Sequence, residues 1–150
     1  MKSAQRRALE YLDRAHVVMT AKEREQIEVS DFGLSKLEHF GVQTLTYFNT
    51  DRICAKQIVL FPNQICPEHW HPRVGTDPGK EETMRIRWGL VYLYIPGASL
   101  ESAAMDRIPE RKDYFTVGKE VILGPGDQIT LAPGTVQDDF VAHCEVVFAF

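Results

Sequence analysis

The sequence predicts an all-β fold, a β-sandwich or barrel with a short N-terminal helical segment, in one domain that spans residues 1–150. Three observations predict it. From about residue 40 onward, β-branched, aromatic and polar residues alternate with the period of a strand. Turns rich in glycine and proline separate these runs, as in all-β proteins. Residues 1–30 instead repeat apolar residues at helical spacing, so we place the barrel at about 40–150.

The N-terminal segment divides into two expected helices. In the first, Ala4, Ala8 and Leu12 recur at four-residue steps and form one apolar face. Thr20 followed three residues later by Glu23 is the pattern of a capping box, which predicts a second helix over residues 21–27.

After residue 40, six runs have the composition of strands and are bounded by turn residues. These runs are residues 42–49, 53–60, 83–94, 120–123, 128–131 and 141–148, the third interrupted by a turn at 88–89. The polar stretch 97–113 is expected to be a loop. Short strands between such turns are what a closed or two-layered β-fold requires.

Composition excludes several classes of protein. Lys and Arg number 17 against 21 Asp and Glu, so the net charge of −4 offers no basic surface for nucleic acid. No apolar run approaches the roughly 20 residues of a membrane helix, and the charged N-terminus has no secretory signal. The 3 cysteines lack the spacing of a metal site and suit reduced thiols, which predicts a cytoplasmic protein.

The strongest chemical signal surrounds His69 and His71. One residue separates them, so an extended backbone directs both imidazoles to one face, where they can chelate a metal ion. After a loop rich in proline and glycine, Glu82 supplies a carboxylate. Without it, an exposed histidine pair at a strand end would be the simpler interpretation, and Glu82 itself could be a solvated neighbour of Lys80 and Glu81. The combination favours a metal site.

Two stretches resemble the two sequence motifs of the cupin superfamily. The first motif in that family supplies two histidines and a glutamate, with a glycine seven residues after the glutamate. Gly89 follows Glu82 at that spacing, which favours Glu82 over Glu81. The second motif runs from a glycine through a Pro-x-Gly-type turn to a histidine. Residues 126–137 fit it, except that Gln137 occupies the position of the histidine.

Within the cupins, the chain resembles the short form of the D-lyxose isomerase family over about residues 25–137. The strings that carry this resemblance are residues 49–52, Lys56, 59–62, 66–69, 78–83 and 85–94, together with 31–34 and 113–117. The resemblance implies a cupin barrel and a metal-dependent isomerase of D-lyxose with D-xylulose and of D-mannose with D-fructose. It also implies a sugar substrate and, as in many cupins, a homodimer.

The resemblance assigns roles to individual residues. One divalent cation would be held by His69, His71, Glu82 and the residue at the second-motif position, Gln137. Mn²⁺ is the expected ion, with Zn²⁺, Co²⁺ or Fe²⁺ as alternatives, because two neutral nitrogens and a carboxylate suit all four. Such an ion can stabilise the enediolate that forms when C2 loses its proton. Lys80 corresponds to a family active-site lysine, and we assign catalytic roles to Lys80 and Glu82.

Two alternatives remain open at this point. After residue 136 the sequence resembles the family poorly, and an amide oxygen of Gln137 is a weaker ligand than imidazole. The chain could therefore be a cupin that binds metal or sugar with little or no catalysis, unless His143 replaces the missing ligand. A cupin of another reaction class, such as a dioxygenase, is the second alternative, because a fold does not fix its chemistry.

Overall fold

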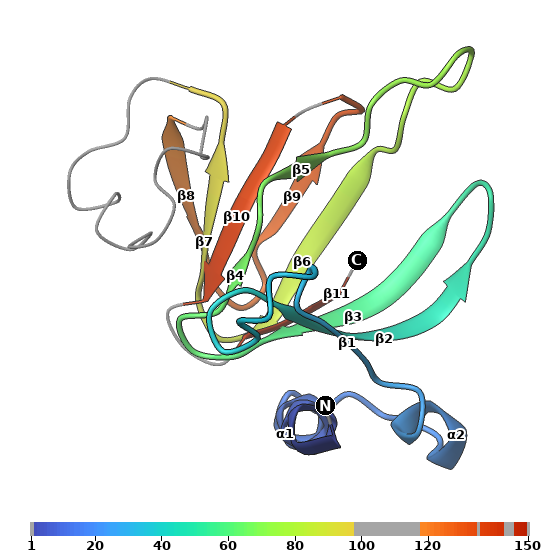
Figure 1. The fold of residues 1–150 in the computed structure, drawn as a ribbon, viewed down its shortest axis with the longest axis vertical. Helices are drawn as coiled ribbons and strands as arrows, with labels where there is room; N and C mark the ends of the chain where they lie inside the picture. The colour runs from blue at the N-terminus through green and yellow to red at the C-terminus, as the bar shows by residue number, and fades with distance from the viewer. Residues whose placement is uncertain (1, 98–117, 135, 143–145, 150) are drawn as a thin grey trace.

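Two antiparallel sheets face each other in the computed structural model, which describes residues 2–97, 118–134, 136–142 and 146–149 (Figure 1). The helices are α1 (Lys2–Arg14) and α2 (Ala21–Arg24). The strands are β1 (Glu28–Ser30), β2 (Val42–Asn49), β3 (Cys54–Leu60), β4 (Ile65–Cys66), β5 (His69–Trp70), β6 (Glu82–Trp88), β7 (Val91–Ile95), β8 (Lys119–Leu123), β9 (Gln128–Leu131), β10 (Val136–Ala142) and β11 (Val146–Ala149).

The larger sheet has the strand order β1-β2-β3-β11-β6-β9. The smaller sheet has the order β4-β10-β7-β8, and β5 pairs with β10 beside this path. Both helices lie outside the two sheets, against the larger one (Figure 1). The predicted all-β class with an external N-terminal helical segment is therefore confirmed. None of the helices in the described ranges has the length and apolar character needed to cross a membrane.

The structure corrects three of the expected elements. The second helix ends at Arg24 instead of residue 27, although its capping box between Thr20 and Glu23 forms as predicted. Residues 28–30 are not helical but form β1, which pairs with the start of β2. The predicted strand 141–148 is in fact parts of β10 and β11, which belong to different sheets. A run with the composition of a strand cannot by itself reveal such a change of sheet. The expected loop 97–113 lies almost wholly outside the described residues.

Three apolar clusters hold the layers together. The first fills the space between the sheets and includes Leu60, Met84 and Leu93. The second joins α1 to the outer face of the larger sheet, where Leu12 and Leu45 have no exposed surface. The third lies on the outer face of the smaller sheet, under residues 34–40. Close packing in these clusters makes the strands a rigid support for the residues at their ends.

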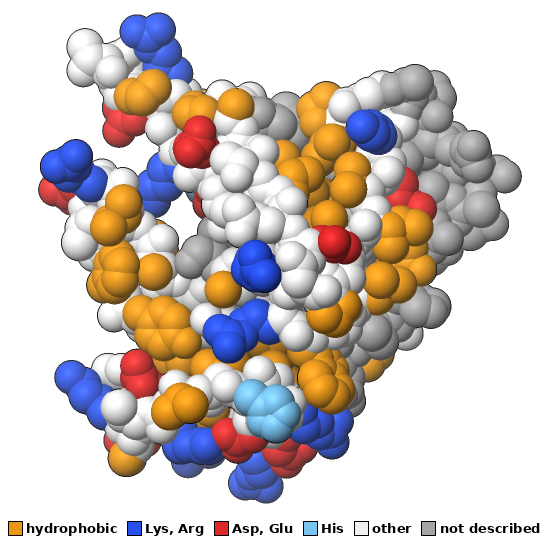
Figure 2. All heavy atoms as spheres, turned by 180° about the vertical axis from the view of Figure 1, so that it is seen from behind, with side chains coloured by type: hydrophobic (Ala, Val, Ile, Leu, Met, Phe, Trp, Pro, Cys, Tyr) orange, Lys and Arg blue, Asp and Glu red, His pale blue; other side chains and the backbone are white. Residues whose placement is uncertain are grey.

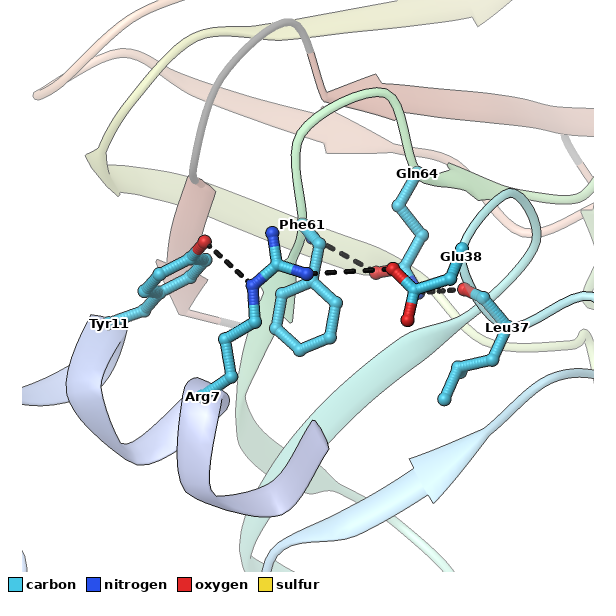
Figure 3. A network of polar contacts seen from close by, with 6 residues as sticks. All are labelled: Arg7, Tyr11, Leu37, Glu38, Phe61 and Gln64. Carbon is cyan, nitrogen blue, oxygen red and sulfur yellow. Dashed lines mark hydrogen bonds and ion pairs between the residues drawn. The ribbon is translucent and has the colours of Figure 1, made fainter. Parts of the chain in front are cut away.

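A polar network fastens α1 and the β3–β4 turn to the rest of the fold (Figure 3). The guanidinium of Arg7 lies 4.0 Å from the centre of the Phe61 ring, and its Nε donates to the Tyr11 hydroxyl at 3.0 Å. Gln64, which is fully buried, accepts from the Phe61 N–H at 3.0 Å and donates to the Leu37 carbonyl at 2.6 Å. The amide of Gln64 thus satisfies two backbone groups just before β4.

We expect Gln64→Ala to lower the free energy of unfolding by about 2–5 kcal/mol, because it leaves the Phe61 N–H and the Leu37 carbonyl without partners and opens a cavity. Urea denaturation measures the loss. Gln26→Ala is the matched control, since Gln26 is exposed, and it should change stability by less than about 0.5 kcal/mol. Equal effects of the two substitutions would contradict the role of the buried amide.

Candidate metal centre

The candidate metal centre lies where the two sheets meet. His69 opens β5, which is attached to the smaller sheet through β10, and His71 follows directly after β5. Glu82 is the first residue of β6 in the larger sheet. The side chains that alternate with Glu82 along β6, Met84 and Ile86, are buried in the core between the sheets. The apolar core therefore fixes the strand that presents the carboxylate.

The three side chains converge on one point. One ligand atom from each of His69, His71 and Glu82 lies within 4.8 Å of the other two. Nε2 of His71 is 2.9 Å from Oε1 of Glu82, and the two imidazole rings are nearly perpendicular, at 85°. Nδ1 of His69 lies 3.0 Å from the carbonyl oxygen of Pro67, and that hydrogen bond leaves Nε2 as the free nitrogen.

Two buried polar atoms of this group fit a cation. His71 is 30% exposed and Glu82 only 11%, yet Nε2 of His71 and Oε2 of Glu82 are buried; within the described structure Oε2 has no hydrogen-bond partner, and Nε2 has only its contact with Oε1 of Glu82. Leaving such atoms unpaired in a folded protein is costly. A divalent cation accepts lone pairs from both, so the donor set of two imidazoles and one carboxylate suits an ion such as Mn²⁺, Fe²⁺, Co²⁺ or Zn²⁺.

A tight loop returns the chain from His71 to Glu82. Val74 and Asp77 form an isolated antiparallel bridge with two hydrogen bonds of 3.0 Å. Gly79 then adopts a φ of +89° and lies against the backbone of His71, so close that a β-carbon would be 2.4 Å from the His71 carbonyl oxygen. Only glycine allows this conformation and this contact together. The loop sequence therefore determines how Glu82 meets the histidines.

The turn of the second motif contacts the same carbonyl group. The N–H of Gly134, in the turn between β9 and β10, donates to the His71 carbonyl at 3.2 Å. The sequence motif predicted this turn but not its contact with His71. The turn leads into β10, whose register sets Gln137 directly opposite His69. Only the backbone of Gln137 is described, and His143 lies outside the described residues.

A cavity of about 570 Å³ opens beside His71 and Glu82. One wall is the tip of the β2–β3 hairpin and the other is the loop of residues 71–81; both project from the same side of the molecule, with a recess between them (Figure 2). The lining side chains are mainly polar or charged, and they include Asn49, Asp51, Arg52, Cys54, Lys56, Asp77, Lys80, Glu81 and Thr83. Such a surface suits a small hydroxylated ligand.

Lys80 lies in the loop before β6, two residues from Glu82, and it lines the cavity together with Glu82. Arg85 and Arg87 are exposed and alternate along β6 with the buried Met84 and Ile86, so they face away from the core. Tyr94 on β7 is fully buried away from the cavity, and its hydroxyl donates to Glu120 at 2.8 Å.

Sequence reasoning did not assign the hairpin residues Arg52 and Lys56 to the cavity. The family resemblance could have indicated them, because both residues belong to the strings that carry it.

Comparisons with known proteins identify the fold. The X-ray structure of Cellulomonas parahominis L-ribose isomerase without ligand superposes with a TM-score of 0.77, at 15% identity, over 99% of this chain and 79% of that one. An uncharacterised Klebsiella pneumoniae protein with a double-stranded β-helix domain superposes with a TM-score of 0.50, at 14% identity, over 72% of each chain. The chain therefore has the cupin, or double-stranded β-helix, fold.

Sequence comparison gives the family, although no family model matches the chain. A D-lyxose ketol-isomerase from Thermofilum sp. is 50% identical over 137 residues, which are 91% of this chain and 76% of the relative. A D-lyxose/D-mannose isomerase from Thermosediminibacter oceani is 48% identical over 136 residues, or 91% of this chain and 75% of the relative. The chain belongs to the D-lyxose isomerase family of sugar isomerases, as its sequence motifs predicted.

We expect Gly79→Ala to weaken metal binding by about tenfold or more, because the added β-carbon must displace the backbone of His71 and the residue must keep a strained φ. Isothermal titration with Mn²⁺ measures the change. Gly75→Ala is the matched control in the same loop, since Gly75 has a φ of +60° but no atom near its β-carbon position. An equal loss in both variants would assign the effect to backbone strain alone.

Proposed function

We propose that this chain is an aldose–ketose isomerase that interconverts D-lyxose with D-xylulose and D-mannose with D-fructose. The observation that carries the proposal is the convergence of His69, His71 and Glu82 beside a polar cavity. Membership of the D-lyxose isomerase family supports isomerisation of a sugar, and the relatives, a D-lyxose ketol-isomerase and a D-lyxose/D-mannose isomerase, suggest the two aldose substrates. Family membership does not favour the alternative of a cupin without catalysis.

The metal centre is proposed to hold one divalent cation through Nε2 of His69, Nε2 of His71 and the carboxylate of Glu82. A bound cation supplies Lewis-acid polarisation of the sugar carbonyl and stabilisation of the negative charge that develops when a proton leaves C2. Glu82 offsets part of the positive charge of the ion within a site that is largely shielded from water. Mn²⁺ is the proposed ion, and Zn²⁺, Co²⁺ and Fe²⁺ fit the same donors.

Lys80 and Glu82 are the proposed catalytic residues. Both line the cavity, so a sugar placed there lies within reach of an ammonium donor and a carboxylate acceptor. Isomerisation requires that a proton leave C2 and return at C1, and that a proton move between the two oxygens. In this proposal the carboxylate of Glu82 takes the proton from C2 and returns it to C1, while the Nζ of Lys80 gives a proton to the carbonyl oxygen and regains one from the neighbouring hydroxyl.

Gln137 is proposed as the residue at the fourth ligand position. Its backbone is paired with that of His69, and directly opposed residues of antiparallel strands project from the same face of a sheet. An amide oxygen is a neutral and weak donor toward these ions. In this proposal the centre therefore binds metal less tightly than a centre with three histidines.

We also propose a cytoplasmic homodimer. Cys54 is a free thiol, as is usual in a reducing compartment. The described strands leave one edge of β2 unpaired beyond Thr44, and Tyr47 and Phe48 on this segment are more than 40% exposed. A second copy of the chain that packed on this edge would pair the free strand and bury the two exposed rings.

The test of the proposed function is isomerisation of D-lyxose and D-mannose by the metal-loaded protein, with metal content measured on the same sample. We expect His71→Ala to reduce metal content well below one ion per chain and turnover at least about 100-fold, because removal of one imidazole breaks the donor set. His39→Ala is the control, since His39 is exposed and outside the triad. Full metal occupancy and activity in His71→Ala would overturn the assignment.

Gln137→His should bind metal more tightly than the parent and turn over D-lyxose faster, because imidazole is the better donor at that position. Metal affinity by isothermal titration and initial rates at saturating metal give the two quantities. If the substitution changes neither, Gln137 does not occupy the vacant ligand position and the alignment of the second motif is wrong.

A further inference from the structure

The loop between His71 and Glu82 contains an acidic side chain that no role considered so far requires. Asp77 closes the turn through its bridge to Val74. In addition, Oδ1 of Asp77 accepts a hydrogen bond of 2.9 Å from the N–H of Gly79. Pro78, which stands between them, has no N–H of its own and has a restricted φ. Of residues 78 and 79, only Gly79 has a backbone N–H. The side chain of Asp77 binds that N–H and so fixes the direction of the chain at this point.

The direction fixed at Gly79 determines where the rest of the loop goes. Gly79 packs on the carbonyl group of His71, and Glu82 follows three residues later with its Oε1 at 2.9 Å from Nε2 of His71. Loss of the Asp77 hydrogen bond would release Gly79 from this contact and let the carboxylate of Glu82 move away from the imidazoles.

We propose that Asp77 is a positioning residue for the metal centre, and that it acts through the acceptor oxygen Oδ1 and not through its charge. This inference rests on the proposed metal site. It assigns Asp77 no contact with the metal or with the substrate, although the residue lines the cavity. Its consequence is that the geometry of Glu82 relative to His71 depends on a hydrogen bond outside the ligand set, as the orientation of metal ligands commonly does.

The chain contains a matched control for this hydrogen bond. In the segment Asp31-Phe32-Gly33, Oδ1 of Asp31 also accepts from the N–H of the glycine two residues later, at 2.9 Å, and that glycine likewise has a positive φ, of +74°. The turn at Asp31 contributes no residue to the cavity or the triad. Replacing each aspartate by alanine removes the same type of interaction at the site and away from it.

The experiment compares Asp77→Ala, Asp77→Asn and Asp31→Ala with the parent, using Co²⁺ as the probe. Isothermal titration gives the affinity, and the visible d–d bands report the coordination geometry of the ion. We expect Asp77→Ala to bind Co²⁺ about tenfold more weakly, as the loss of one hydrogen bond predicts, with altered bands. Asp77→Asn, which keeps an acceptor oxygen, should stay within about twofold of the parent with unchanged bands. Asp31→Ala should bind as the parent does.

Thermal unfolding of the metal-free proteins separates a positioning role from a loss of general stability. Asp77→Ala and Asp31→Ala should lower the unfolding temperature by similar amounts, whereas only Asp77→Ala should weaken Co²⁺ binding. Parental affinity and bands in Asp77→Ala would overturn the inference. Equal defects in Asp77→Asn and Asp77→Ala would assign the effect to the charge and overturn it as well, as would an equal loss of affinity in Asp31→Ala. A parent that binds no Co²⁺, Mn²⁺ or Zn²⁺ would instead overturn the proposed metal site itself.

Discussion

The carbonyl group of His71 is the point on which the arrangement of the metal centre depends. Gly134 donates to it from the turn after β9, and Gly79 packs against it from the loop that leads to Glu82. One backbone group thus fixes the end of β5, the return loop and the entry into β10. Because each of these segments carries a proposed ligand or leads directly to one, close backbone packing sets the relative positions of the side chains before any ion binds.

The rest of the fold makes this contact possible by keeping the strands rigid. The core between the sheets buries Met84 and Ile86 on β6, which fixes Glu82 at the start of that strand. On the other side, the buried amide of Gln64 and the packing of α1 hold the chain that leads into β4 and β5. Among the described residues, Oε2 of Glu82 is buried without a hydrogen-bond partner beside the cavity, where a ligand can satisfy it.

Much of this arrangement follows from the sequence because its signals are local. The alternation of residues 42–49, the capping box at Thr20 and the spacing of His69, His71 and Glu82 each need only a short window. Three features were not predictable in this way. The change of sheet between β10 and β11, the contact of Gly134 with His71 and the approach of the β2–β3 hairpin to the cavity all depend on how distant segments pack. Periodicity carries no information about such pairings.

The three ligand candidates come from both sheets, with the histidines on the side of β5 and the glutamate on β6. An ion held by all three is therefore also a cross-link between the two layers of the barrel. Any ligand that binds only the folded state stabilises it by mass action, and this one would stabilise the contact between layers in particular. Metal supply would then govern not only turnover but also how long the folded protein persists in the cell, so that starvation for the ion would mark the protein for degradation.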